Sequence, residues 1–152
     1  QYAKLGIPVN VSEISVTGRR DLGDGDRFQE LVAEKLYRLW FSHAATNGII
    51  WWNLVDGTAA YAPLDSEEGE NKYHGGLLNF DLSPKPAFKA LKRLIKDEWM
   101  NSGSFDYEHG KLNQLHGFYG DYELTIKTNS GTFKEKIRLT KESKNQFKLV
   151  LS

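Results

Sequence analysis

The sequence predicts an α/β fold followed by a small antiparallel β meander, and three observations predict it. An apolar strand over residues 6–16 and a second over residues 49–55 flank one amphipathic helix at about residues 27–44. The second strand is apolar along nearly its whole length, which is typical of a parallel strand that is covered on both faces. After residue 116, short segments alternate apolar and polar residues, which predicts antiparallel strands.

The helix between the two strands is predicted from the spacing of its apolar residues. Positions three and four apart recur on one broad face, which is formed by Phe28, Leu31, Val32, Leu36, Leu39 and Trp40, with Tyr37 and Phe41 alongside. Asp24 or Asp26 could cap the helix N-terminus. A single helix between two parallel neighbours fits a right-handed crossover.

A long loop and a second helix follow the second strand. The loop covers residues 56–76, and connections of this length in compact domains are usually functional or disordered. Pro84 and Pro86 precede a helix predicted at about residues 87–100. Its apolar face consists of Phe88, Leu91, Leu94, Ile95 and Trp99.

The predicted domain organisation has three parts. Residues 1–100 form the α/β part, residues 101–116 a polar linker, and residues 117–152 a small antiparallel β domain. The strands expected in this last part are Tyr119–Lys127, Thr132–Thr140 and Gln146–Leu151, with turn sequences between them. A three-stranded sheet of this size is marginal alone, so it is expected to pack on the preceding part or to pair with further strands.

The α/β part is expected to be incomplete. Two parallel strands and two helices cannot close a barrel or bury both faces of a sheet. The end of a larger α/β fold therefore explains residues 1–100 better than assembly with another polypeptide. The start, Gln1–Leu5, reads as the end of a helix that runs into the first strand, so an upstream part is expected to be missing.

The composition excludes several classes of function. The net charge is zero and no basic stripe occurs, which argues against nucleic acid as a partner. Cysteine is absent, so a thiolate zinc site and a cysteine nucleophile are excluded. No run of about 18 apolar residues predicts a membrane span. The four histidines, His43, His74, His109 and His116, show no metal-ligand spacing, so neither a metal site nor a cofactor is predicted.

Glu13 is the first candidate for a functional residue. It is a carboxylate within an apolar strand, where burial is costly without a partner, so it is either satisfied by a buried donor or used in chemistry. The second strand carries Trp51 and Trp52, whose side chains must point to opposite faces. Carboxylates beside aromatic rings are typical of sugar-cleaving sites.

The first strand resembles the nucleophile motif of glycoside hydrolase family 10, the retaining endo-β-1,4-xylanases. The matching residues are Gly6, Val9, Val11, Ser12, Glu13, Ile14 and Val16. Residues 52–57 are similar to the eighth-strand motif of that family, and residues 76–81 and 84–88 resemble the segment before its last helix. The sequence departs from the family at Ser15, where an acidic or amide residue is usual.

The resemblance implies that the chain holds the last two β/α units of a (β/α)8 TIM barrel, followed by the β meander. It implies Glu13 as the nucleophile, and an acid/base glutamate on an upstream strand that is not in this chain. Trp52 would stack on a sugar while Trp51 packs under a helix, and Tyr61 and Tyr73 would line sugar subsites. Asp56 would contact substrate or form an Asx turn with Gly57.

Further expectations follow from the same resemblance. The partners would be xylan or a related β-1,4-linked plant polysaccharide and the missing N-terminal part of the barrel, without nucleic acid, membrane or cofactor. The enzyme would be secreted, or located in the periplasm or at the cell surface of a bacterium, and the isolated chain would be inactive. A different class of function stays open, a non-catalytic glycan-binding protein on a degenerate barrel, for which Ser15 would be the first sign. Glu70 is the other carboxylate considered as a catalyst, although a solvated loop charge explains it better.

Overall fold

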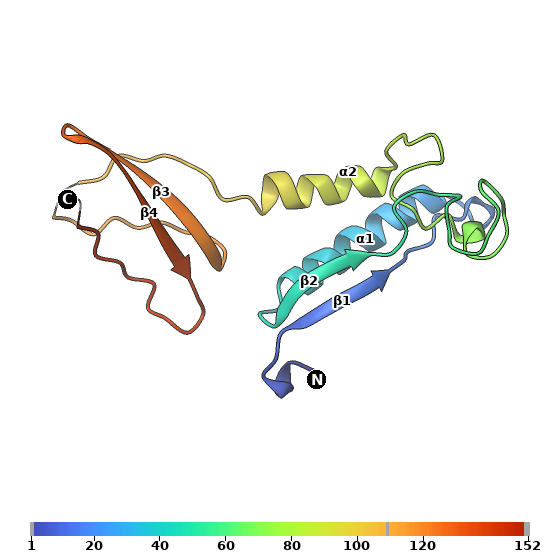
Figure 1. Ribbon diagram of the computed structural model, residues 1–152, viewed down its shortest axis with the longest axis horizontal. Coiled ribbons are helices and arrows are strands. Elements are labelled where there is room, and N and C mark those ends of the chain that lie inside the picture. Colours follow the sequence, from blue (N-terminus) through green and yellow to red (C-terminus); the bar gives the residue numbers. More distant parts are fainter. Residues whose placement is uncertain (1, 109, 151–152) are drawn as a thin grey trace. The chain divides into compact units, whose positions relative to one another are not determined.

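A computed structural model of the chain describes residues 2–108 and 110–150, which form two compact units, Gln1–Glu98 and Trp99–Ser152. The first unit contains, in chain order, η1 (Tyr2–Leu5), β1 (Val9–Ile14), η2 (Arg20–Leu22), α1 (Gly25–Phe41), β2 (Thr46–Trp51), η3 (Asn71–Tyr73), α2 (Pro86–Arg93) and η4 (Leu94–Glu98) (Figure 1). The second unit contains β3 (Gly120–Thr128) and β4 (Gly131–Leu139). The predicted order of strand, helix, strand and helix is confirmed.

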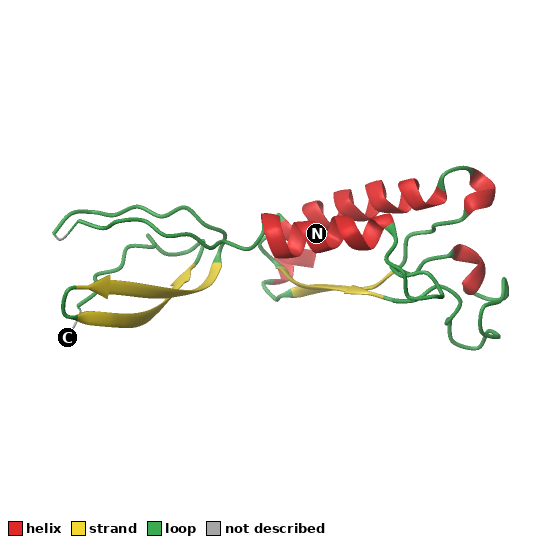
Figure 2. Cartoon of the chain, turned by 90° about the horizontal axis from the view of Figure 1, so that it is seen from above, coloured by secondary structure: helices red, strands yellow, loops and turns green. Residues whose placement is uncertain are grey.

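The two strands of the first unit form a parallel pair, as predicted. The register joins Val9 to Thr46, Asn10 to Gly48, Val11 to Ile49 and Ile14 to Trp51. Helices α1 and α2 cover one face of this sheet (Figure 2). The described residues of the first unit leave the other face open, since Ile50 in β2 and Trp52 and Leu54 just after it are exposed. The sequence predicts that β2 is buried on both faces, but the described residues of the first unit cover only one, because they form a single helical layer.

Helix α1 begins at the acidic residue that caps it. The Asp24 carboxylate accepts a hydrogen bond from the backbone N–H of Arg27 at 3.0 Å, which satisfies one of the free donors of the first turn. Asp26, the other candidate, lies inside the helix and pairs with Arg20 at 3.0 Å. Asp24 is therefore the cap.

The buried face of α1 differs from the predicted one. Gln29, Ala33 and Tyr37, each four residues apart, are buried against the sheet and α2. The large apolar residues Phe28, Leu31, Leu39 and Phe41 are exposed. The prediction was wrong here because apolar spacing identifies an amphipathic face without identifying what covers it. Only a narrow strip of α1 contacts this two-stranded sheet.

Helix α2 starts at a proline and packs through small residues. Pro86 occupies its first turn, where a missing N–H costs nothing, and Ala87 and Ala90 are buried against α1. The helix continues as a π-helical turn to Glu98, two residues short of the predicted end. Among the residues that the structure describes, no helix is long and apolar enough to cross a membrane.

The second unit is a two-stranded antiparallel hairpin, not the predicted three-stranded meander. Strands β3 and β4 pair along their full length, with Tyr122 opposite Ile137 and an ion pair of 2.6 Å between Asp121 and Arg138. No strand occurs in 146–150 of the described residues, and Leu151 lies outside them. The side chain of Asn145 instead bonds the backbone of Thr140, which closes a local turn.

Candidate functional site

The carboxyl end of β1 contains a β-bulge that carries Glu13. Three residue steps from Val11 to Ile14 lie opposite two steps from Ile49 to Trp51, so β1 has one extra residue. Glu13 has a φ of 56°, in the left-handed region that a glutamate rarely adopts. Bulges of this kind re-aim a side chain, and ligands of α/β sheets bind at the carboxyl ends of strands. The bulge therefore presents Glu13 where a ligand would be expected.

Glu13 is exposed, and its strand end is tied to Trp52. The carbonyl oxygen of Ile14 accepts a hydrogen bond of 2.9 Å from the backbone N–H of Trp52. Among residues 2–108 and 110–150, the Glu13 carboxylate has no hydrogen-bond or ion-pair partner. Within the described residues, Glu13 is therefore not a strand glutamate whose charge is satisfied by a buried donor. The fold brings Glu13 and Trp52 to the same end of the sheet.

The two tryptophans have different surroundings, as the alternation of strand side chains requires. The Trp51 ring lies on the helix side, with its centroid 6.4 Å from that of Tyr37, whose pKa is raised by burial. Trp52 is 49% exposed, and its indole N–H donates to the Glu70 carboxylate at 3.1 Å. The prediction that Trp51 packs under a helix is confirmed. Trp52 is thus about half exposed at the surface.

Asp56 lies in the interior, and its carboxylate is occupied by groups of the chain. Oδ1 accepts a hydrogen bond from the backbone N–H of Gly76 at 2.7 Å, and Oδ2 pairs with the ammonium of Lys85 at 2.9 Å. Its exposed fraction is 9%. This geometry gives Asp56 a role in holding the loop, and its contact with substrate stays a prediction.

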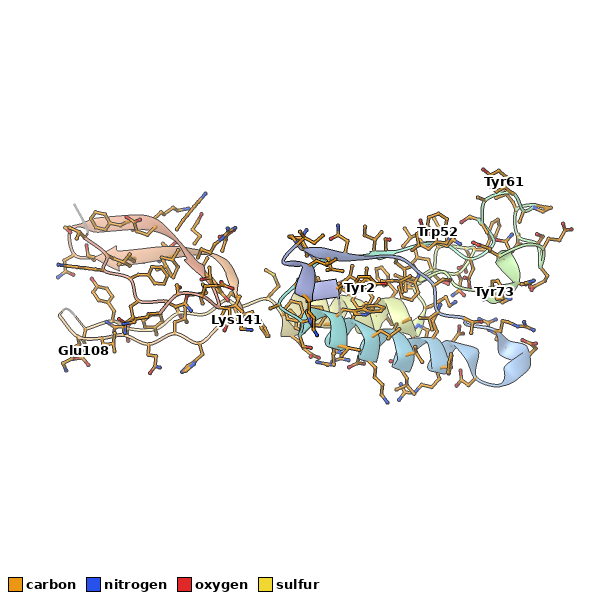
Figure 3. The ribbon with its side chains drawn as sticks, turned by 90° about the horizontal axis from the view of Figure 1, so that it is seen from below. Tyr2, Trp52, Tyr61, Tyr73, Glu108 and Lys141 are labelled. Atoms are coloured by element: carbon orange, nitrogen blue, oxygen red, sulfur yellow. The ribbon has the colours of Figure 1, made fainter. Side chains whose placement is uncertain are left out.

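The two loop tyrosines are not brought together with Glu13 in one cleft. Tyr61 is fully exposed and projects outward from the loop (Figure 3). Tyr73 is 42% exposed, and the Lys72 ammonium lies 5.2 Å from the centroid of its ring. Both remain predicted sugar contacts on the same loop.

Two polar hollows lie among the loops of the first unit. Both are lined by Arg20, Glu67 and His74, and the first is also lined by Asp56. Glu13, Trp52, Tyr61 and Tyr73 line neither hollow. Glu13 and Trp52 therefore belong to an open surface at the sheet end, distinct from these hollows.

Comparisons with known proteins give a partial likeness of fold. No protein-family model matches the chain, and no curated protein matches it. Two solved structures are similar over 64% of the chain: xylanase 10B from Thermotoga petrophila RKU-1 in complex with xylobiose (19% identity, TM-score 0.47) and native xylanase 10B from Thermotoga maritima (20% identity, TM-score 0.46). The aligned part spans 29% of each xylanase chain. A likeness at this level carries no conclusion about activity.

His74 is the one histidine beside carboxylates in the described part of the chain. Its Nε2 lies 3.2 Å from Glu67, and its Nδ1 lies 3.9 Å from Asp56. Across the described residues, no group of three or more His, Asp or Glu side chains is placed to hold a metal ion. His109 lies outside these residues.

Two buried polar residues behind the site were missed by sequence reasoning. Lys85 is 1% exposed and Gln29 is 0% exposed, and both donate hydrogen bonds to the end of the long loop. A lysine between two prolines gives no sign of burial. Gln29 precedes Ala33 and Tyr37 at a spacing of four, which is the pattern that could have placed it on the buried face.

Proposed function

We propose that this chain forms the C-terminal part of a retaining endo-β-1,4-xylanase that hydrolyses β-1,4-xylosidic bonds of xylan, with Glu13 as the nucleophile. One observation carries the proposal. Glu13 lies on a bulge at the carboxyl end of a parallel strand, in a left-handed backbone conformation. The sequence of this strand resembles the nucleophile motif of family 10. Backbone strain of this kind clusters at functional sites.

The proposed reaction is a double displacement. The Glu13 carboxylate attacks the anomeric carbon, and a second carboxyl group about 5 to 5.5 Å away protonates the leaving oxygen. Water then cleaves the glycosyl-enzyme ester with the second group acting as a base, which restores both carboxyl groups. The second glutamate is assigned to a segment outside this chain, so the isolated chain is expected to be inactive.

The proposed partner within the enzyme is the N-terminal part of the barrel. Ile50 in β2, together with Trp52 and Leu54 just after the strand, exposes an apolar face. The backbone hydrogen bond from Trp52 to Ile14 joins this face to the end of β1 that carries Glu13. Neighbouring barrel strands would cover such a face and bring the second carboxyl group to Glu13. The substrate is a β-1,4-linked plant polysaccharide, so we assign the enzyme to the secreted class.

Substrate contacts are proposed for four residues. Trp52 is the platform on which a sugar ring stacks, since this aromatic residue is 49% exposed at the carboxyl end of the sheet. Tyr73 and Tyr61 are proposed as further contacts from the loop. Asp56 is the least accessible of the four, because it is 9% exposed and each of its oxygens already has a partner in the chain.

The experiment uses the polypeptide expressed from the reading frame that extends upstream of Gln1. It is incubated with a 2-fluoro xylobioside that carries a good leaving group, and the adduct is located by peptide mass mapping. The expected result is label on Glu13. Glu13→Gln should abolish turnover while xylan binding is kept, and Glu142→Gln, which changes an exposed carboxylate of the second unit, serves as the matched control that keeps turnover.

Two results would contradict the proposal. Normal xylan hydrolysis by the Glu13→Gln variant would show that the nucleophile is another residue. A folded polypeptide that binds xylan but takes no label would support the glycan-binding protein, the alternative that Ser15 suggests.

A further inference from the structure

The end of the long loop is held by donors from outside the loop. Four consecutive carbonyl oxygens each accept a hydrogen bond: Tyr73 from the Thr17 hydroxyl and the Gly18 N–H, His74 from Lys85 and Gln29, Gly75 from Trp51, and Gly76 from Gln29. Regular secondary structure supplies none of these bonds. The conformation of residues 73–76 therefore depends on a few side chains.

The buried side chain of Gln29, on α1, links the end of the long loop to the residues that follow β1. Its side-chain amide donates to the carbonyl oxygens of Val16 at 2.9 Å, Gly76 at 3.0 Å and His74 at 3.3 Å. Its Oε1 is buried and has no hydrogen-bond partner among the described residues. The opposite amide orientation would place that oxygen against three carbonyl oxygens, so the donor end must face them. One side chain of α1 thus holds the residues after β1 against the loop end.

Lys85 holds the same loop end from the start of α2. Its ammonium lies 2.9 Å from Asp56 Oδ2, 2.8 Å from the carbonyl oxygen of His74 and 3.8 Å from Asp26 Oδ1. A buried ammonium needs a paired charge, and removal of one partner leaves the other buried and uncompensated. Lys85 and Asp56 therefore depend on each other.

The packing around these residues leaves no room for adjustment. A Cβ atom on Gly18 would lie 2.7 Å from the His74 carbonyl oxygen and 2.9 Å from Lys85 Nζ. A Cβ atom on Gly75 would lie 2.5 Å from the hydroxyl of Ser15, two residues after Glu13. The loop end and the end of the Glu13 strand are thus closely packed against each other.

We propose that Lys85 and Gln29 are positioning residues that hold residues 73–76 against the end of the Glu13 strand. By holding the loop, they fix where Tyr73 and Glu70 lie relative to Glu13 on the strand. Glu70 is the residue that bonds Trp52. The effect of Lys85 and Gln29 on glycan binding rests on the proposed function, whereas their effect on the loop conformation does not.

The test uses the same upstream-extended polypeptide and four variants: Lys85→Met, Gln29→Met, the double variant Lys85→Met/Asp56→Asn, and the exposed control Lys89→Met. Amide hydrogen exchange rates are measured in residues 56–76 and compared with those in α1. The indole N–H of Trp51, which is bonded to Gly75 in the loop, is followed by NMR. In Lys85→Met and Gln29→Met, exchange in the loop should rise at least about tenfold, because each substitution leaves carbonyl oxygens of the loop end without their donors. Exchange in α1 should stay within about twofold of the parent. Neutralising Asp56 should restore part of the protection, since the uncompensated charge is gone.

The outcomes separate this proposal from the proposed function. Unchanged loop exchange, or equal losses in the loop and α1, overturns the positioning role. If Lys85→Met does not fold, Gln29→Met and the double variant decide in the same way. On xylan, loop loosening should raise KM more than it lowers kcat, and loosening without any kinetic change overturns the effect on glycan binding. If the unsubstituted polypeptide cleaves no xylan, the proposed function is rejected. The hydrogen-exchange result then still decides whether Lys85 and Gln29 hold the loop.

Discussion

The indole N–H of Trp51 donates a hydrogen bond of 2.9 Å to the carbonyl oxygen of Gly75. This bond joins β2 to the end of the long loop on the helix side of the sheet. The next residue, Trp52, points to the other face and reaches the loop through Glu70. Trp51 and Trp52 therefore contact the same loop from opposite faces of the sheet. Trp51 does so on the packed helix side, and Trp52 does so on the exposed side.

Substitution of the two tryptophans should give opposite results. Trp51→Ala is expected to lower the free energy of unfolding by roughly 3 kcal/mol, because it removes packing against Tyr37 and leaves the Gly75 carbonyl without its donor. Trp52→Ala should cost less than about 1 kcal/mol, since the residue is 49% exposed, and should weaken xylan binding. Denaturant unfolding and affinity electrophoresis measure the two effects. Equal stability losses would contradict this division of roles.

Asn71 should stabilise the fold of the long loop. It is 4% exposed, and its Oδ1 accepts from the N–H of Ala59 at 2.8 Å while its Nδ2 donates to the Pro63 carbonyl oxygen at 2.9 Å. Asn71→Ala leaves a buried N–H unsatisfied, so we expect a loss of about 1 to 3 kcal/mol. Limited proteolysis of the loop and urea unfolding provide the measurements. Asn129→Ala, in the exposed turn between β3 and β4, is the control and should be neutral.

Gly75→Ala should destabilise the protein because of one specific collision. The new methyl group would lie 2.5 Å from Ser15 Oγ, and forced overpacking costs about 1 to 3 kcal/mol. Ser15→Ala in the same chain removes that oxygen and should recover part of the loss. A double-mutant cycle measured by thermal unfolding checks the coupling. The control is Gly103→Ala, where a methyl group would meet nothing within 4 Å; additive effects of the Gly75 and Ser15 substitutions would rule out the collision.

Glu34 should contribute stability only at higher pH. Hydrogen bonds from Arg38, and then from Arg93, outweigh partial burial and hold the pKa of this carboxyl below its usual range. Because the pKa is lower in the folded state, the contribution is fully present above the unfolded value of about 4.3 and is lost as the pH falls through the folded value. Glu34→Gln should therefore lower the free energy of unfolding by less than about 1 kcal/mol at neutral pH.

Urea unfolding at a series of pH values checks this contribution. The difference between Glu34→Gln and the parent should shrink as the pH falls below about 4. Glu142→Gln, which changes an exposed carboxylate in the second unit, should show no such trend. A constant difference at all pH values would assign the effect of Glu34→Gln to packing.

Several elements followed from local pattern. The apolar run of β2, the amphipathic spacing of α1 and the alternation in β3 each set the type of element, because backbone periodicity decides which side chains share a face. The turn sequence between Thr128 and Gly131 likewise set the hairpin. Of the strand expected at 146–151, residues 146–150 form no strand, because alternation sets which side chains would share a face but does not make the segment pair with an edge.

The sequence by itself determined the order of the elements, the parallel strand pair and Glu13 and Trp52 as candidate residues. Only the tertiary structure decided that Glu13 lies on a bulge, that Asp56 is turned inward, and that Lys85 and Gln29 are buried beneath the loop. The physical reason is range. Periodicity and turn chemistry act between residues a few positions apart. Register, burial of charge and loop closure depend on groups far apart in the chain, such as Thr17 and Tyr73, which are 56 positions apart.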